Sequence, residues 1–170
     1  TGPYGQAKLT ADEHVRRYSD LYGLSAMALR YFNVYGPRQR PNDGVVPTLL
    51  SQAFADEPLT IHGTGKQTRD FVYVSDVVDA TVAAATADCA GEAINVGSGT
   101  AHSILNLARD VRDAAGRDVP LTHVDARRNQ IEASRADISK AERVLDFEPD
   151  TSLREGLENT AEWYREFHER

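Results

Sequence analysis

Two polar side chains near the start of the sequence have a spacing that suits acid–base chemistry. Tyr4 and Lys8 lie four residues apart in a segment with helical periodicity, so both project from one helix face, one turn apart. A lysine ammonium beside a phenol favours the phenolate, which can accept a proton from a substrate and later return it. The pair predicts an acid–base site at Tyr4; the alternative is an ordinary pair on a helix surface.

A third side chain, Arg69, has surroundings that suit anion binding. It stands between a glycine-containing turn and an apolar strand, where a guanidinium needs an anion, and its planar fork matches phosphate oxygens. One charge-assisted contact of this kind contributes roughly 1.5–3 kcal/mol. The sequence therefore indicates a phosphate contact at Arg69; the alternative is a salt bridge to the neighbouring Asp70.

The elements that must position these residues alternate between helix and strand. Apolar residues recur at the helical period over 4–22, and Gly23 follows as a stop signal. The run 25–32 is almost continuously apolar, which predicts a strand buried on both faces of a parallel sheet. Two prolines and two glycines make 34–44 a loop. A helix, a turn and a buried strand form half of a βαβ unit.

The same alternation continues to the end of the chain. Further strands are predicted at 59–61, 70–74, 93–96 and 120–124. Helices are predicted at 49–54 and from N-terminal positions at Ser75, Ser103, Ser139 and Ser152. Ser139 with Glu142, and Ser152 with Glu155, have the spacing of capping boxes. The whole pattern predicts an α/β fold.

Length and composition exclude several classes of protein. The 170 residues are 41% hydrophobic and 26% charged, which suits a globular chain of about one domain. A formal net charge of −7 without a basic stripe argues against nucleic-acid binding, and no apolar run approaches the roughly 18 residues of a membrane span. A single cysteine, Cys89, fits a reducing compartment, and the five histidines show no metal-ligand spacing. We expect a cytoplasmic protein without a metal.

Five motifs in a fixed order strongly resemble the extended short-chain dehydrogenase/reductase family. They are YGQAK at 4–8, LRYFNVYGPRQ at 29–39, QTRDFVYV at 67–74, NVGSG at 95–99 and ADISKA at 136–141. Within that family the chain is most similar to the NAD-dependent epimerase/dehydratase branch, of the UDP-glucose 4-epimerase type. The resemblance covers essentially the whole chain.

The resemblance implies a two-lobed α/β architecture. The C-terminal portion of a Rossmann-like doubly wound parallel sheet would come from 1–35 and 70–97. A smaller α/β substrate-binding lobe would come from 36–69 and 98–170. The family usually begins with a glycine-rich fingerprint and carries a catalytic Ser or Thr upstream of its Tyr, and this sequence shows neither. We therefore expect the C-terminal half of an enzyme, inactive on its own, and by resemblance a homodimer.

The resemblance also assigns ligands to particular residues. The residues implied to contact NAD are Tyr4, Lys8 and Tyr31. Those implied to contact the diphosphate of a nucleotide sugar, most simply a UDP-sugar, are Asn33, Arg69 and Arg127. Those implied to line the uracil ring and the rest of the substrate are Val46, Thr60 and His62. Arg127 and Arg128 could instead be a solvated pair, and the last three could be plain helix and strand residues.

The activity implied by the resemblance is reversible oxidation at C4 of the sugar, with Tyr4 as acid–base and NAD as hydride carrier. A 4-epimerase is favoured by the motifs around Arg69 and Asn33. The alternatives are a nucleotide-sugar 4,6-dehydratase or UDP-glucuronate decarboxylase of the same family, and a non-catalytic sensor that binds NAD or a nucleotide sugar. Asn129 and Gln130 stand where the family commonly has Gly and Asp, which leaves the placement of the substrate ribose open.

Overall fold

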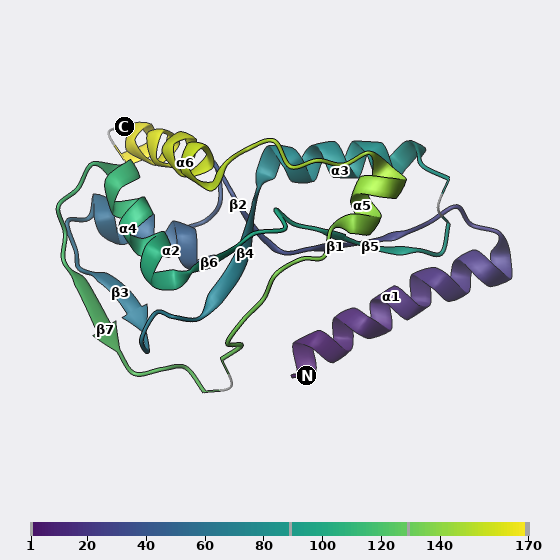
Figure 1. The fold of residues 1–170 in the computed structure, drawn as a ribbon, viewed down its shortest axis with the longest axis horizontal. Helices are drawn as coiled ribbons and strands as arrows, with labels where there is room; N and C mark the ends of the chain where they lie inside the picture. Colours follow the sequence, from purple (N-terminus) through teal and green to yellow (C-terminus); the bar gives the residue numbers. More distant parts are fainter. Residues whose placement is uncertain (1, 89, 129, 169–170) are drawn as a thin grey trace.

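The computed structural model describes residues 2–88, 90–128 and 130–168, so Cys89 and Asn129 lie outside the described residues. Helices and strands alternate along the chain, as predicted (Figure 1). Their order is α1 (Pro3–Tyr22), β1 (Ala28–Tyr31), β2 (Asn33–Tyr35), α2 (Val45–Phe54), β3 (Leu59–His62), β4 (Thr68–Tyr73), α3 (Val74–Thr86), β5 (Ala93–Val96), β6 (Ala101–Ser103), α4 (Ile104–Ala115), β7 (Leu121–Val124), α5 (Ser139–Leu145) and α6 (Leu153–His168).

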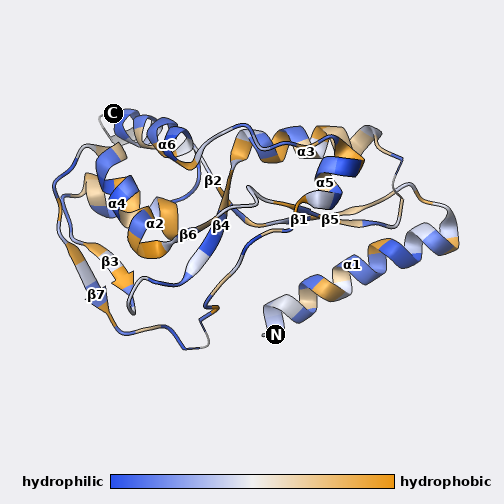
Figure 2. Cartoon of the chain, in the orientation of Figure 1, coloured by the Kyte–Doolittle hydropathy of each residue, from blue (hydrophilic) through white to orange (hydrophobic). Residues whose placement is uncertain are grey.

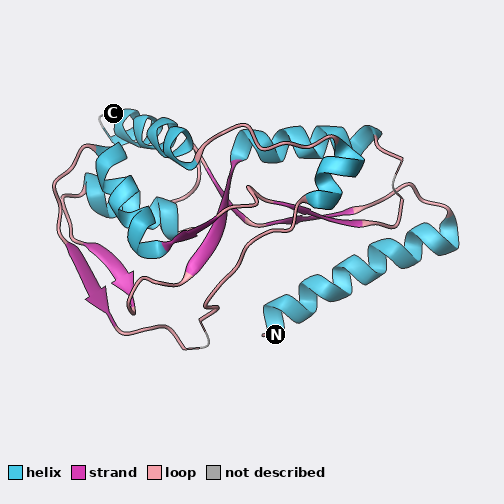
Figure 3. Cartoon of the chain, in the orientation of Figure 1, coloured by secondary structure: helices cyan, strands magenta, loops and turns pink. Residues whose placement is uncertain are grey.

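The strands form small, mostly parallel sheets, and Figure 3 shows them between the helices. β1 pairs with β5, β2 with β4, and β3 with β7, each pair parallel. β6 adds an antiparallel strand on the N-terminal part of β4. The predicted parallel α/β fold is confirmed, and β6 is an addition that the sequence did not indicate.

Two of the four predicted helix starts are confirmed. The hydroxyl of Ser103 accepts the Asn106 backbone N–H at 3.2 Å, and the hydroxyl of Ser152 accepts the Glu155 backbone N–H at 3.2 Å. These bonds satisfy donors that the first helical turn leaves free.

At the other two positions the helix is present, but the predicted capping role of the serine is wrong. α3 begins one residue before Ser75, with Tyr73 at the N-cap, so Ser75 lies inside the first turn. Ser139 is the first residue of α5, and its hydroxyl donates to Asp137 Oδ1 at 2.6 Å instead of capping the helix. In both places the serine is tied to a neighbouring side chain and not to the backbone of the next turn.

Buried apolar side chains gather into two clusters. The first joins α2, α4 and α6 to β2, β3 and β4, and it includes Leu49, Leu50, Ile61, Leu107, Val111, Leu157 and Tyr164. The second joins β4 and β5 to α3 and α5, and it includes Val72, Ala80, Ile94, Val96, Ala141 and Phe147. Figure 2 shows the apolar faces of these helices turned toward the strands. The division into two lobes at the residue numbers given above stays a prediction.

One side of the molecule is less covered than the sequence predicts. No described residue of α1 is buried, and Tyr18, Leu21 and Tyr22 are exposed. In β1 the first two residues are half-buried and the last two, Arg30 and Tyr31, are exposed. The prediction of a strand buried on both faces is therefore wrong for this chain, because α1 does not pack a buried face onto it.

The described residues contain no helix with both the length and the apolar character needed to cross a membrane.

Candidate functional site

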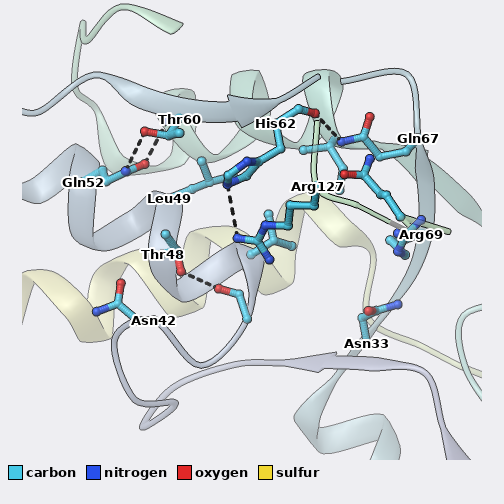
Figure 4. A pocket seen from close by; sticks show the side chains of 14 residues that line it. Asn33, Asn42, Thr48, Leu49, Gln52, Thr60, His62, Gln67, Arg69 and Arg127 are labelled. Atoms are coloured by element: carbon cyan, nitrogen blue, oxygen red, sulfur yellow. Dashed lines mark hydrogen bonds between the residues drawn. The ribbon is translucent and has the colours of Figure 1, made fainter. Parts of the chain in front are cut away.

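A polar cavity of about 370 Å³ opens where β2, α2, β3, β4 and the segment after β7 meet. Its polar lining residues are Asn33, Asn42, Thr48, Gln52, Thr60, His62, Gln67, Arg69, Arg127 and Gln130. Figure 4 shows Arg127 in the middle of this lining, with Arg69 and Asn33 to one side. Five of the six residues predicted to contact substrate thus line one cavity.

Strand pairing brings Asn33 and Arg69 to the same face. Asn33 stands opposite Phe71 in the parallel β2–β4 ladder, two residues after Arg69. Side chains two apart in a strand project from the same face, so Arg69 and Asn33 share the cavity side. The Asn33 amide donates to the Asp70 backbone carbonyl at 2.7 Å, which holds it in place with its own carbonyl oxygen and second N–H still free for a ligand.

Arg69 has no carboxylate partner in the structure. Its guanidinium donates to the Thr68 carbonyl at 2.6 Å, and none of the ion pairs found among the described residues includes it. Partial burial lowers its pKa because desolvation disfavours the charged form. A half-buried, unpaired guanidinium is the group that gains most from an incoming anion.

The alternative salt bridge between Arg69 and Asp70 is wrong. Consecutive strand residues point to opposite faces, and Asp70 points away from the cavity with no exposed surface. Its Oδ1 accepts the Ser98 N–H and hydroxyl at 2.7 and 2.8 Å, and its Oδ2 accepts the N–H groups of Gly99 and Ala136, both at 3.0 Å. The carboxylate thus ties β4 to the turn after β5 and to the segment before α5.

Arg127 reaches the cavity from the end of β7. Because β7 runs parallel to β3, with Val124 opposite His62, the residues after β7 return beside the His62 ring. The Arg127 Nη2 lies 3.2 Å from His62 Nε2, and the His62 Nδ1 lies 3.2 Å from the Asp125 carbonyl oxygen. Arg127 lines the cavity, whereas Arg128 is not among its lining residues. Both are exposed, so the phosphate-binding role of Arg127 stays a prediction.

Thr60 faces the cavity because strand alternation buries its neighbours. Leu59 and Ile61 enter the core, while Thr60 and His62 turn to the cavity side. The Gln52 amide donates to the Thr60 hydroxyl and accepts the Thr60 N–H, both at 3.0 Å. This closed pair fixes polar groups of helix and strand at one end of the cavity.

Val46 is placed differently from the other predicted contacts. It is 1% exposed and belongs to the first hydrophobic cluster, whereas its neighbour Val45 lines the cavity. One residue along a helix rotates the side chain by about 100°, which separates the core side from the cavity side. A contact between Val46 and a substrate stays a prediction, and the residue that the geometry offers is Val45.

Several lining residues were not predicted from the sequence. Thr48 and Gln52 are one turn apart on α2, a helix whose buried side chains are otherwise apolar, and that polar stripe was an available signal. Gln67 donates to the His62 carbonyl at 2.9 Å and so braces the turn between β3 and β4. Asn42 and Gln130 come from loops, where no periodicity marks them.

The predicted acid–base pair stands apart from the cavity. Tyr4 is 77% exposed on α1, and the Lys8 ammonium lies 5.6 Å from the centre of its ring, so the two share one face as expected. Neither residue is among those that line the cavity. Tyr31 is 46% exposed and its hydroxyl lies 2.9 Å from the Thr81 hydroxyl. The roles of Tyr4, Lys8 and Tyr31 stay predictions.

The charge of the cavity is one-sided. Its described lining holds two guanidinium groups, neutral amides and hydroxyls, and no Asp or Glu. Such a surface suits an anion that also offers hydrogen-bonding groups, and it disfavours a cation.

Curated proteins of similar sequence act on nucleotide sugars. The chain is 39% identical over 158 residues to an uncharacterized UDP-glucose epimerase of Bacillus subtilis, a match that covers 92% of this chain and 50% of that protein. It is 37% identical over 154 residues to UDP-N-acetyl-alpha-D-glucosaminuronate decarboxylase of Bacillus cytotoxicus, covering 86% of this chain and 48% of that protein. The chain spans about half the length of these relatives.

Solved structures that superimpose on this chain include enzymes crystallised with UDP-sugars. UDP-glucose 4-epimerase of Thermotoga maritima, solved with UDP-glucose, superimposes with a TM-score of 0.95 at 35% identity, over 99% of this chain and 55% of that one. UDP-glucuronic acid 4-epimerase of Bacillus cereus, solved with UDP-glucuronic acid and NAD, gives a TM-score of 0.90 at 36% identity, over 98% and 53%. The predicted Rossmann-like fold is therefore confirmed over about half the length of these enzymes.

The family model for NAD dependent epimerases and dehydratases matches residues 1–97, more than half of the chain. Together with relatives above 30% identity over most of its length, this match shows that the chain belongs to the NAD dependent epimerase/dehydratase family.

Proposed function

We propose that this chain forms the substrate-binding half of an NAD-dependent UDP-sugar 4-epimerase. One observation carries the proposal: the guanidinium groups of Arg69 and Arg127, which form no ion pair among the described residues, line one cavity together with the Asn33 amide. A diphosphate supplies the negative charge and the oxygen acceptors that these groups lack. Each charge-assisted bond to a phosphate oxygen is worth roughly 1.5–3 kcal/mol.

The remainder of the cavity suits the nucleoside. Thr60 and His62 lie on the same side of β3, and Gln52 with Thr48 faces them from α2. Amides and hydroxyls held in this way can satisfy the donors and acceptors of a base and a ribose. That UDP is the nucleotide is supported by the related structures that hold UDP-glucose and UDP-glucuronic acid.

The family's cofactor is NAD, and a related structure contains it. The Tyr4–Lys8 pair fits the ribose end of a dinucleotide, because its phenol and ammonium lie on one exposed face of α1. Lys8 would hold the nicotinamide ribose, and Tyr31 would contact the same cofactor. When bound, NAD supplies the hydride acceptor for oxidation at C4 of the sugar.

The acid–base work falls to Tyr4. Its phenolate oxygen takes the proton of the sugar 4-hydroxyl, and the positive charge of Lys8 stabilises that phenolate. In an epimerase the 4-keto sugar would then turn over. The other face of C4 would receive the hydride from the reduced cofactor, and Tyr4 would return the proton to the oxygen at C4. Throughout, Arg69, Arg127 and Asn33 would hold the diphosphate, so the nucleotide stays fixed while the sugar moves.

A UDP-sugar decarboxylase is the second candidate, because a decarboxylase is among the relatives at 37% identity. Both activities begin with the same oxidation at C4 and share the diphosphate site. The motifs around Asn33 and Arg69 favour the epimerase. Incubation of the complete protein with NAD and either UDP-glucose or UDP-glucuronate separates them: chromatography detects the C4 epimer in the first case, and a decarboxylase releases carbon dioxide only in the second.

The diphosphate site is tested by binding. We expect Arg69→Ala and Arg127→Ala each to weaken UDP binding to the complete protein by about tenfold to a hundredfold, measured by isothermal titration calorimetry. Arg128→Ala is the matched control, because Arg128 is adjacent in sequence but does not line the cavity. Equal UDP affinity in all three variants and the unmodified protein would contradict the proposed site.

A further inference from the structure

We propose that His62 is a positioning residue that orients the Arg127 guanidinium toward the diphosphate without neutralising it. The proposal rests on the proposed function, because it concerns the same nucleotide-diphosphate site. It differs from a direct contact between His62 and the base, since His62 would act through Arg127.

The backbone around His62 is held on both sides. The Gly63 N–H donates to the Val124 carbonyl at 2.8 Å, continuing the β3–β7 pairing, and the Gln67 side chain donates to the His62 carbonyl at 2.9 Å. The end of β3 therefore has little freedom to move relative to β7. The ring at this position can act as a fixed point for a side chain that follows β7.

The hydrogen bonds define which ring nitrogen carries the proton. A guanidinium only donates, so His62 Nε2 must accept from Arg127 Nη2 across their 3.2 Å separation. The proton then lies on Nδ1, which donates to the Asp125 carbonyl oxygen at 3.2 Å. The backbone carbonyl of Asp125 thus selects the tautomer that Arg127 requires. Figure 4 shows the His62 ring facing the Arg127 guanidinium.

An imidazole acceptor has a particular advantage at this place. Arg127 is exposed, and a free arginine side chain carries about 2 kcal/mol of rotamer entropy that a ligand would have to overcome. A carboxylate partner would also fix the guanidinium, but it would cancel the charge that attracts a phosphate. Neutral His62 restricts the side chain and leaves its full positive charge available.

The role is tested with a double-mutant cycle on the complete protein, using UDP as the probe in calorimetry. His62→Phe keeps an aromatic ring and removes the acceptor, and we expect it to weaken UDP binding by about threefold to tenfold. In the Arg127→Ala background the same change should have no further effect. His62→Gln should restore most of the affinity, because its amide oxygen can accept from Arg127.

Two controls separate positioning from a structural loss. The first control is His123→Phe, on the neighbouring strand β7. The His123 Nδ1 lies 2.7 Å from the Gly63 carbonyl oxygen, but His123 does not line the cavity. This substitution should leave the affinity for UDP unchanged. Uridine, which lacks phosphates, should lose no affinity in His62→Phe. If His62→Phe does not fold, His62→Ala in the same cycle gives the same comparison.

Each outcome bears on a stated claim. An equal loss from His62→Phe with and without Arg127, or a matching loss for uridine, would show direct contact and overturn the positioning role alone. A loss of UDP affinity with Arg127→Ala but none with His62→Phe would also overturn the positioning role, because the orientation of Arg127 would then not depend on His62. If Arg127→Ala has no effect on UDP binding, the diphosphate site itself and the role of His62 both fail.

Discussion

The cavity region and the α1 region differ in how firmly their functional side chains are held. Around the cavity, α2, α4 and α6 bury Leu49, Leu107 and Leu157 completely or nearly so, and the strands that carry Asn33 and Arg69 lie against this core. On α1, by contrast, no described residue is buried, and Tyr4 and Lys8 are fixed only by their helix.

This contrast separates binding from chemistry. The arginine and amide side chains that line the cavity are oriented by hydrogen bonds to other described residues. Tyr4 and Lys8 have the spacing of an acid–base pair. Among the described residues, however, no contact from another element orients these two side chains toward a substrate. Substitutions in one region should therefore leave the function of the other largely intact.

The largest expected effect is loss of turnover without loss of binding. In the complete protein Tyr4→Phe removes the proton acceptor, and we expect turnover of UDP-glucose to fall by about 10²- to 10⁴-fold while UDP affinity stays the same. Tyr18→Phe, on the same exposed helix, is the control. Equal turnover in Tyr4→Phe and the unmodified enzyme would remove Tyr4 from the mechanism.

The next effect concerns the Asp70 carboxylate, which joins β4 to the turn after β5 and to the segment before α5. Asp70→Asn replaces one of the two carboxylate oxygens by an NH₂ group. That group then faces either the Ser98 N–H or the N–H groups of Gly99 and Ala136, so at least one buried donor loses its acceptor. We expect a loss of about 3 kcal/mol in the free energy of unfolding, measured by chemical denaturation.

Asp79→Asn is the matched control, because Asp79 is exposed on α3. An Asp70→Asn protein as stable as this control would show that β4, the turn after β5 and the segment before α5 do not depend on the carboxylate for their connection.

A smaller effect is expected where α6 packs on β2 and β4. A methyl group on Gly156 would overlap the Tyr35 hydroxyl and approach Tyr73 Cδ2 to 2.9 Å. Overpacking of this kind costs about 1–3 kcal/mol, which outweighs the gain of about 1 kcal/mol from helix propensity. Thermal unfolding should show Gly156→Ala below the unmodified protein, whereas Asn159→Ala, exposed on the same helix, should match it.

The smallest expected effect is a change in how the stability of the folded protein depends on pH, and it concerns the carboxyl group of Asp76. Burial raises the pKa of Asp76 above its usual 3.8, although a hydrogen bond from Thr151 opposes the rise. A raised folded-state pKa means that the folded protein binds the proton more tightly, so stability declines as the pH rises from about 4 through that raised value.

Asp76→Asn should abolish this decline. The difference in thermal midpoint between Asp76→Asn and the unmodified protein should grow in favour of the variant as the pH rises above 4. Asp118→Asn is the matched control, because Asp118 is exposed and is not among the groups that act on Asp76, and it should show no such trend. A constant difference across the pH range would mean that Asp76 does not titrate differently in the folded state.

The sequence predicted the elements of the fold well wherever a local signal exists. The strand at 93–96 has the predicted limits, and the helix after Ser103 ends before Gly116, because an N-cap, a helical period and a left-handed glycine all act within a few residues. β6 was missed because Ala-His-Ser has no strand pattern, and its conformation comes from pairing with Thr68–Asp70.

For the site, the sequence indicated which residue types bind phosphate but not how they are held. Thr60 and His62 came only from the family resemblance, and the strand alternation of β3 explains why they share a side. The sequence could not show that Asp70 is occupied by backbone donors or that His62 accepts from Arg127, because those contacts join segments far apart in the chain. Val46 shows the limit in a helix, where a shift of one residue, from Val46 to Val45, changes a buried side chain into one that lines the cavity.

The divided pairing of β4 restricts how this chain can change in length. Its first three residues pair with β6 and its last three with β2, and the exchange of partners falls between Asp70 and Phe71. A one-residue insertion there would keep the register of one ladder only and turn either Arg69 away from the cavity or Phe71 out of the core. We therefore expect length polymorphism among homologous proteins in the loops at 36–44 and 125–135, and an invariant residue count in β4.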